Sequence, residues 1–146
     1  LSGAARAAVE RWRGTAGEGR HEIRLETDGE ALVQAAPSEL AAILDNLVEN
    51  AIKYSPEGSP VTIECGRDNG LASIGVMSSS GPLDSEVASR AFERFYRGGG
   101  GSGTGLGLPI VAALARRRGG DAKIEGLDET WVRAEVTLPI AGFANP

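Results

Sequence analysis

Three polar side chains at helical spacing form the first candidate site in this sequence. Asn46, Asn50 and Lys53 stand at i, i+4 and i+7, so they line up along one side of a helix. Amide oxygens are ligands for a hard divalent cation, and a lysine ammonium suits phosphate. The row predicts a site for a metal ion and an anion; a solvated flank of an amphipathic helix is the alternative.

A glycine-rich loop is the second candidate site. Four consecutive glycines at 98–101 precede Gly103-Thr104-Gly105-Leu106-Gly107-Leu108, which opens a predicted helix. Glycines let the backbone approach a ligand closely, and a helix N-terminus offers unpaired N–H groups to an anion. A flexible linker is the alternative. Rossmann and P-loop patterns do not fit, because no strand precedes the loop and no Lys-Ser/Thr pair follows it. A mobile lid describes the segment better than a rigid cradle.

Residues 37–54 form the helix that must position the polar row. Pro37 suits the first helical position, and Glu39 places a negative charge in the first turn. Ser55 and Pro56 end the helix. An apolar stripe recurs at helical spacing along it: Leu40, Leu44, Leu47 and Ala51. Because the stripe borders the row, the helix is expected to turn one side to the core and the adjoining side to a ligand.

The remaining elements are predicted from periodicity and turn residues. Helices are expected at residues 1–12, 85–92 and 106–118, and strands at 21–26, 31–35, 60–66, 71–76, 122–127 and 131–138. The strands are expected to pair as antiparallel neighbours, 21–26 with 31–35 first, and Asp68-Asn69-Gly70 is a hairpin turn. The last helix is expected to turn Leu106, Ile110, Val111 and Leu114 to the core and to end at Gly119-Gly120. Asp84 is expected to cap the short helix at 85–92. The expected fold is an α/β sandwich (α+β), a mixed, mainly antiparallel sheet with about three helices on one face.

The totals exclude several classes of protein. The chain has 146 residues, a length that suits one domain with a full core. Its formal charge of −5 argues against a non-specific grip on nucleic acid. The single cysteine, Cys65, excludes an internal disulfide, and no apolar run approaches a membrane span. Because the sequence does not begin with Met, we expect a piece of a longer protein.

Three motifs together resemble one known family. Asn46-x-x-x-Asn50-Ala51-x-Lys53-Tyr54-Ser55, Phe92-Glu93-Arg94-Phe95-Tyr96-Arg97 and Gly103-Thr104-Gly105-Leu106-Gly107-Leu108 are similar in order and spacing to the asparagine, phenylalanine and second glycine boxes of the catalytic, ATP-binding (HATPase_c) domain of two-component sensor histidine kinases. The resemblance spans residues 37–138. It implies the Bergerat (GHKL) fold, which this family shares with gyrase B, Hsp90 and MutL.

The resemblance also implies a domain organisation. The whole of 1–146 would be a single catalytic and ATP-binding domain. Residues 1–13 would be the tail of the connection from a dimerisation and phosphoacceptor domain that this sequence lacks, and residues 92–107 a mobile ATP lid. His21 in HEIRL superficially looks like the phosphoacceptor motif, but the segment alternates like a strand, so we interpret it as an ordinary strand residue.

The resemblance implies roles for the polar row. Asn50 would coordinate Mg²⁺ through its side-chain oxygen, and Asn46 would hydrogen-bond the phosphates or their water. Lys53 would contact the phosphates, and Tyr54 would lie beside the adenine.

From the lid, Arg97 would face the γ-phosphate, with Arg94 as a second candidate. Gly103, Thr104, Gly105, Leu106, Gly107 and Leu108 would fold over the triphosphate. Asn50, Lys53 and Arg97 would be the catalytic residues, since phosphoryl transfer needs positioning and charge neutralisation.

One box departs from the family pattern. The family carries Asp-x-Gly-x-Gly, whose Asp binds the adenine amino group, and here the stretch reads Ser78-Ser79-Ser80-Gly81-Pro82. Replacing a carboxylate acceptor by Ser78 is expected to weaken ATP binding by about tenfold to a hundredfold. The alternative function is therefore a degenerate, nucleotide-impaired domain acting as a regulatory or interaction module. A serine kinase of the anti-sigma-factor type shares the fold, but the phenylalanine box argues against it.

The implied function is transfer of the ATP γ-phosphate to a histidine on the protein's own, separate dimerisation domain. A cognate response regulator would then take the phosphoryl group. No nucleic acid and no membrane contact by this domain are expected. The full-length protein is expected to be a homodimer, the isolated domain a monomer, and the location the cytoplasmic side of a membrane-anchored bacterial sensor.

Overall fold

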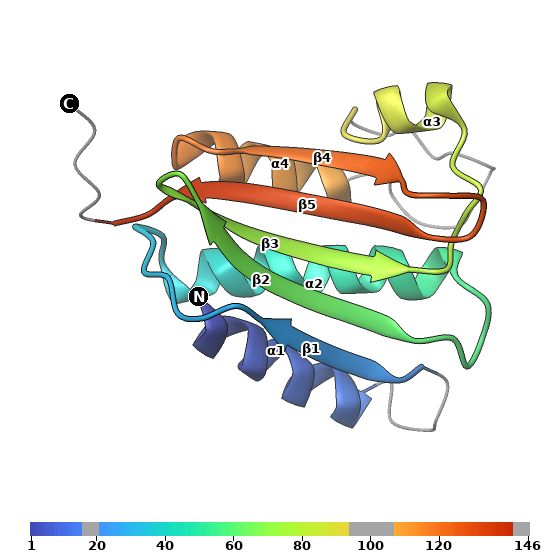
Figure 1. Ribbon diagram of the computed structural model, residues 1–146, viewed down its shortest axis with the longest axis horizontal. Helices are drawn as coiled ribbons and strands as arrows, with labels where there is room; N and C mark the ends of the chain where they lie inside the picture. The colour runs from blue at the N-terminus through green and yellow to red at the C-terminus, as the bar shows by residue number, and fades with distance from the viewer. Residues whose placement is uncertain (16–20, 94–106, 142–146) are drawn as a thin grey trace.

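The sheet is mixed. In the described part of the chain, one edge strand runs parallel to its neighbour, and all other neighbouring strands are antiparallel. The computed structural model describes residues 1–15, 21–93 and 107–141. Within those residues five strands lie in the order β1-β2-β3-β5-β4 (Figure 1). Their bounds are β1 Ile23–Thr27, β2 Val61–Asp68, β3 Leu71–Ser78, β4 Asp121–Gly126 and β5 Val132–Pro139. β1 pairs with β2 in parallel, and the other neighbours are antiparallel.

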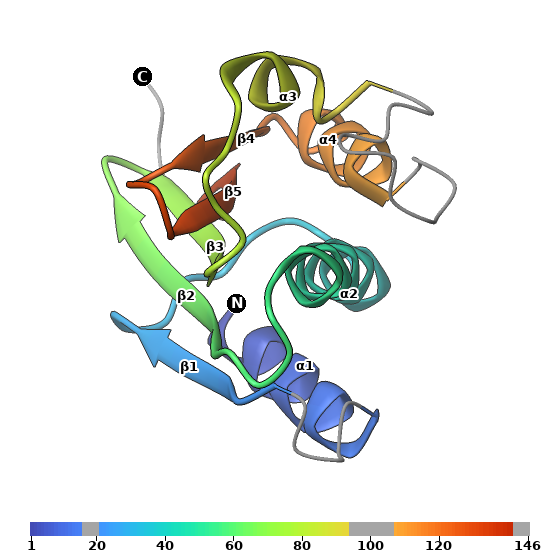
Figure 2. The same cartoon turned by 90° about the vertical axis from the view of Figure 1, so that its right-hand side faces the viewer.

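Three helices cover one face of this sheet. The helices of the described residues are α1 Ser2–Thr15, α2 Pro37–Tyr54, α3 Ser85–Arg90 and α4 Gly107–Arg117. Figure 2 shows α1, α2 and α4 side by side on the same face, whereas α3 lies beyond the end of the sheet. The predicted α/β sandwich is confirmed, and the central helix has the predicted bounds.

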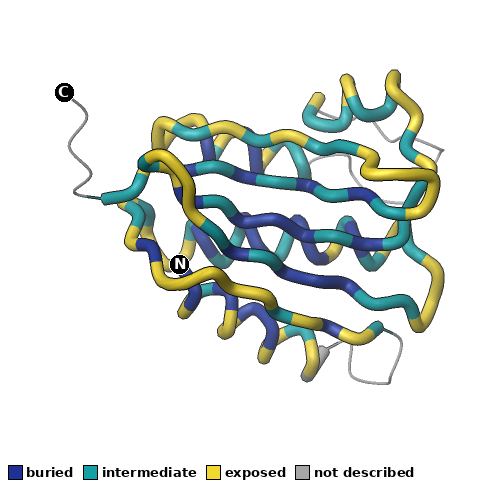
Figure 3. Tube along the Cα trace, viewed as in Figure 1, coloured by how far each residue is buried: buried dark blue, intermediate teal, exposed yellow. Residues whose placement is uncertain are grey.

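The core lies between the inner face of the sheet and these helices. The middle strands β2, β3 and β5 alternate, with every second side chain buried, and the edge strands are more exposed (Figure 3). Largest among the fully buried side chains are Ile23, Ile43, Leu44, Leu47, Ile63, Ile74 and Leu138. Each contributes about 1.5–3 kcal/mol by leaving water, so the α2 stripe and the strands hold each other in place.

The turn between β2 and β3 has the conformation that its sequence predicts. Asn69 has φ 50° and Gly70 has φ 80°, both in the left-handed region, and Asp68 pairs with Leu71 across the turn. Asn-Gly is favoured there because those two residues tolerate positive φ in a two-residue hairpin.

The predicted strand at 31–35 is wrong. It does not pair with β1, and its one isolated bridge in the described residues joins Val33 to Ile140, just after the end of β5. The neighbour of β1 is β2, which is reached through the long helix α2. A crossover through a helix favours a parallel pair, and five residues of alternation do not reveal which partner a strand will have.

The prediction of which α4 residues face the core contains one error. Val111, Ala112 and Ala115 are buried, but Ile110 is 43 % exposed. The buried stripe is therefore rotated away from Ile110. The helix ends as predicted, because Gly119 adopts φ 83° and the N–H of Gly120 donates to the carbonyl of Ala115 at 2.9 Å.

Candidate functional site

Helix α2 begins with a tightly held first turn. Pro37 stands at its start, and the N–H of Ala36 donates to Glu39 Oε1 at 2.9 Å. That N–H and the Arg118 guanidinium hold the pKa of Glu39 below its usual range. Anchored here, and with its stripe in the core, α2 carries its polar row toward the end where β3 finishes and α4 starts (Figure 1).

The polar row meets the start of α4 at Asn46. Its amide Nδ2 donates one of its two N–H groups to the carbonyl of Ala42 at 2.7 Å, so the second N–H and Oδ1 are left for other contacts. A Cβ added to Gly107 would lie 3.2 Å from that oxygen. Gly107 and Leu108 are the first residues of α4, where backbone N–H groups lack partners within the helix. The asparagine motif and the second glycine motif are therefore neighbours in space.

The next residues of the row face outward. Asn50 is partly buried, and within the described ranges its side chain has no hydrogen-bond partner. Lys53 is exposed, and its ammonium lies 5.5 Å from the centroid of the Tyr54 ring, which is itself 40 % exposed. An unused amide oxygen and an exposed cation suit an external oxygen-rich ligand.

Ser78 ends β3 on the face that the helices cover. It pairs with Val61 on one side and Val132 on the other, and it is only 2 % exposed. Its hydroxyl lies 2.8 Å from the hydroxyl of Ser80, and either can donate. Unlike a carboxylate, this hydroxyl pair offers both a donor and an acceptor to a ligand.

The loop after Ser78 is held by the turn between β4 and β5. The N–H of Gly81 donates to the carbonyl of Thr130 at 2.8 Å, and a Cβ at Gly81 would lie 2.8 Å from the carbonyl oxygen of Glu129. The peptide bond from Gly81 to Pro82 is cis. Only glycine allows this close approach of two backbones.

Asp128 organises that turn. Its Oδ1 accepts from the N–H of Trp131 at 2.8 Å and of Thr130 at 2.7 Å, and these bonds hold the pKa of Asp128 below its usual range. This contribution was not predicted from the sequence. An Asp two and three residues before such N–H groups is a recognisable turn signal, but the contact of Thr130 with Gly81 is not visible in the sequence.

Several predicted residues lie outside the described part of the chain. They are Arg94, Arg97, Gly103, Thr104, Gly105 and Leu106, together with most of the predicted lid. The cap of α3 is confirmed, because Asp84 Oδ1 accepts from the N–H of Glu86 at 2.7 Å. His21 lies just before β1, with Nδ1 2.9 Å from the carbonyl of Ser59.

The donor set fits Mg²⁺ only with help from a ligand. No group of three or more His, Cys, Asp or Glu side chains that could hold a metal occurs among the described residues. Asn46 Oδ1 and the unpaired amide of Asn50 are hard oxygen donors. Mg²⁺ commonly uses one or two protein oxygens and completes its shell with phosphates and water. None of the helices in the described ranges is both long enough and apolar enough to cross a membrane.

Comparison with known proteins agrees with this geometry. Residues 35–142 match the family described as histidine kinase-, DNA gyrase B-, and HSP90-like ATPase (HATPase_c). The chain is 35% identical over 128 residues to sensor protein IrlS of Burkholderia pseudomallei, which covers 84% of this chain and 27% of IrlS. It therefore spans about a quarter of the length of the curated relatives it matches.

Solved structures agree as well. The nucleotide-free catalytic domain of histidine kinase ThkA superposes with a TM-score of 0.84 at 26% identity, covering 96% of this chain and 92% of that one. Full-length ShkA in complex with AMPPNP gives 0.84 at 26%, covering 99% and 31%. A further structure holds ThkA in complex with response regulator protein TrrA, with a TM-score of 0.81 at 24%, covering 97% and 40%. The chain belongs to the histidine kinase-, DNA gyrase B- and HSP90-like ATPase family, as an ATP-binding catalytic domain of the sensor histidine kinase type.

Proposed function

We propose that this domain binds Mg·ATP between the polar row of α2 and the start of α4. In the whole protein it transfers the γ-phosphate to a histidine on the protein's own dimerisation domain. The observation that carries the proposal is the contact between Asn46 and Gly107, because it joins an amide row to a helix N-terminus. These groups offer oxygen ligands for a cation and N–H donors for phosphate in one place.

Each side chain has a defined task in this proposal. Asn50 holds the cation through its amide oxygen, and Asn46 orients the phosphates. Lys53 neutralises phosphate charge, and the exposed Tyr54 ring lies beside the adenine. Mg²⁺, when bound, supplies the charge neutralisation that phosphoryl transfer requires. Arg97 and residues 103–108 complete the cover over the triphosphate.

The Ser78 and Ser80 hydroxyl pair recognises the adenine base. Ser78 is buried at the end of β3, beside a loop held by Gly81 and the turn at Asp128. A neutral hydroxyl binds an amino group less strongly than a carboxylate does, so the affinity is lower than that of an aspartate-containing relative. The complex of ShkA with AMPPNP supports nucleotide binding by a domain of this fold.

The partners follow from the same proposal. The phosphoryl acceptor is a dimerisation domain outside these residues, and a response regulator takes the group from it, as the complex of ThkA with TrrA suggests by analogy. The whole protein is a homodimer. We place the domain on the cytoplasmic side of a membrane-anchored sensor, because ATP is found there and its relatives are bacterial sensor proteins.

Calorimetric titration tests the proposal on the parent and on Ser78→Asp, with Mg·ATP and Mg·GTP. We expect the parent to bind Mg·ATP with a Kd in the micromolar to submillimolar range, on the order of −5 to −8 kcal/mol. Ser78→Asp is expected to tighten ATP binding by about tenfold to a hundredfold, because it restores a charged acceptor.

Two results contradict the proposal in different ways. If the parent binds no ATP and Ser78→Asp does, the native domain is nucleotide-impaired, and the regulatory alternative, which the relatives do not favour, takes its place. If neither protein binds Mg·ATP, the site itself is wrong.

A further inference from the structure

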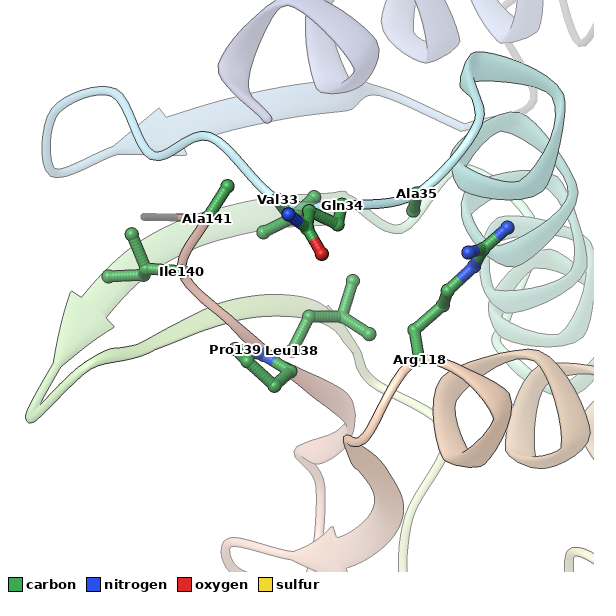
Figure 4. Close-up of a pocket in the computed structure, with 8 residues that line it drawn as sticks. All are labelled: Val33, Gln34, Ala35, Arg118, Leu138, Pro139, Ile140 and Ala141. Carbon is green, nitrogen blue, oxygen red and sulfur yellow. The ribbon is translucent and has the colours of Figure 1, made fainter. Parts of the chain in front are cut away.

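A hollow lies at the opposite end of α2 from the polar row. It has a volume of about 270 Å³ and lies between the end of β5, the segment before α2 and the end of α4 (Figure 4). Its apolar walls include Val33, Leu138, Pro139 and Ile140. This volume is at the lower end of the range for small-molecule sites, so it suits a compact ligand.

Two polar side chains line this hollow. Figure 4 shows the amide of Gln34 turned into the space and the guanidinium of Arg118 at its rim. A few polar groups among apolar walls are the usual composition of a site that orients one ligand.

Arg118 has unused hydrogen-bonding capacity. Its Nε donates to Glu39 Oε1 at 3.0 Å, and Nη2 donates to the same oxygen. A guanidinium carries five N–H donors, so three remain without a partner within the described part of the chain. The Arg118 side chain is 40 % exposed, which leaves those donors accessible.

The charges around Glu39 do not balance. Arg117 Nη1 lies 3.8 Å from Glu39 Oε2, so two arginines share one carboxylate. The cluster of Glu39, Arg117 and Arg118 therefore has a formal charge of +1. Only Arg118 of the two arginines lines the hollow.

We infer that this hollow is a binding site for a small carboxylate with a compact apolar body. The carboxylate pairs with the free N–H donors of Arg118, the apolar body lies on Val33, Leu138 and Ile140, and Gln34 contributes an amide contact. A guanidinium fork matches a carboxylate in geometry and charge. This site is separate from the proposed nucleotide site.

Four proteins test the charge argument: the parent, Arg118→Gln, Arg117→Gln and Glu39→Gln. Gln at 39 keeps the side-chain cap on Ala36, because Glu and Gln both serve at that position. Hexanoate and benzoate are titrated into each ¹⁵N-labelled protein, with hexanamide and benzamide as uncharged matches. Backbone shifts of Val33, Gln34 and Ile140 report on the hollow, and the Asn50 side chain reports on the polar row.

The expected order of carboxylate affinity is Glu39→Gln, parent, Arg117→Gln, Arg118→Gln, from tightest to weakest. Glu39→Gln removes a competing carboxylate and should tighten binding several-fold. In Arg117→Gln, Glu39 pairs with Arg118 alone, and this should weaken carboxylate binding a few-fold. Arg118→Gln should weaken it at least tenfold, and the amides should bind weakly to all four proteins.

Four results overturn the inference. Equal binding of acids and amides would mean that the hollow recognises no charge, and shifts confined to Asn50 would place the acids at the polar row. Nuclear Overhauser contacts between Phe143 and Ile140 in the free protein would identify the chain's own following segment as the occupant. Absence of any shift up to the solubility limit of the probes would also refute it.

Discussion

The two ends of helix α2 use their polar groups in opposite ways. At its start, which we call the arginine end (Glu39, Arg117 and Arg118), a carboxylate caps the helix and pairs with two arginines. At its far end, the polar-row end (Asn46, Asn50 and Lys53), Asn50 has no protein partner within the described ranges. Buried polar groups are almost always hydrogen-bonded, so an unpaired amide beside a core needs an explanation, which the proposed ligand supplies.

The comparison also extends to the glycines at the two ends. At the arginine end, Gly120 packs directly against the backbone of Thr137 where α4 turns into β4. At the polar-row end, Gly107 faces the side-chain oxygen of Asn46, which a Cβ at Gly107 would approach to 3.2 Å. A backbone carbonyl cannot move without shifting the strand, whereas the end of a side chain can adjust.

The largest expected effect is on stability at the arginine end. In Gly120→Ala, the new Cβ would overlap the carbonyl oxygen of Thr137, so strand β5 or the end of α4 must shift. We expect the free energy of unfolding to fall by about 3 kcal/mol, measured by urea denaturation. The remaining folded protein should bind Mg·ATP as the parent does.

Gly3→Ala is the control for this prediction. Nothing lies within 4 Å of a Cβ at Gly3, which is near the start of α1. Its stability should be unchanged or rise by up to about 1 kcal/mol. Equal stability of both variants would show that the arginine end is not tightly packed.

The next effect is on binding at the polar-row end. Asn50→Ala should weaken Mg·ATP binding by about a hundredfold, since it removes the amide oxygen proposed to hold the cation. The unfolding free energy should stay within about 0.5 kcal/mol, because the side chain has no partner within the described part of the chain.

The matched control is Glu49→Ala, one residue earlier on the same helix and exposed. It should bind Mg·ATP like the parent in the same calorimetric titration. A stability loss above about 1 kcal/mol in Asn50→Ala, with binding kept, would reverse the contrast between the two ends.

The smallest expected effect is the pH dependence of the arginine end. The N–H of Ala36 and then Arg118 lower the pKa of Glu39 below its ordinary value of about 4.5. A lowered folded-state pKa means that Glu39 contributes its stabilisation above the ordinary value, and that this is lost as the pH falls through the folded-state value. Urea denaturation from pH 7 down to pH 3 should therefore show a steeper loss in the parent than in Glu39→Gln.

Asp121 and Asp128 also have lowered pKa values, through backbone N–H bonds first. Both are present in the parent and in Glu39→Gln, so the difference between the two curves isolates Glu39. Superimposable curves would mean that the ion pairs with Arg117 and Arg118 contribute nothing measurable, as is common for exposed pairs.

The local elements could be predicted from the sequence. The bounds of α2, the Asn69-Gly70 turn, the Asp84 cap and the glycine end of α4 were all predicted correctly. Helix periodicity, caps and turns depend on residues within a few positions of one another, so a single sequence contains their causes. The three family motifs were visible for the same reason.

Which distant segments meet could be seen only in the folded chain. It pairs β1 with β2 rather than with residues 31–35, holds the Ser78 loop on the turn at Asp128, and sets Asn46 against Gly107. It also pairs Glu39 with Arg118, which is 79 positions later in the sequence, beside a hollow that no sequence motif predicts. Such contacts depend on how the whole core packs, and the spacing of residues along the sequence does not reveal that packing.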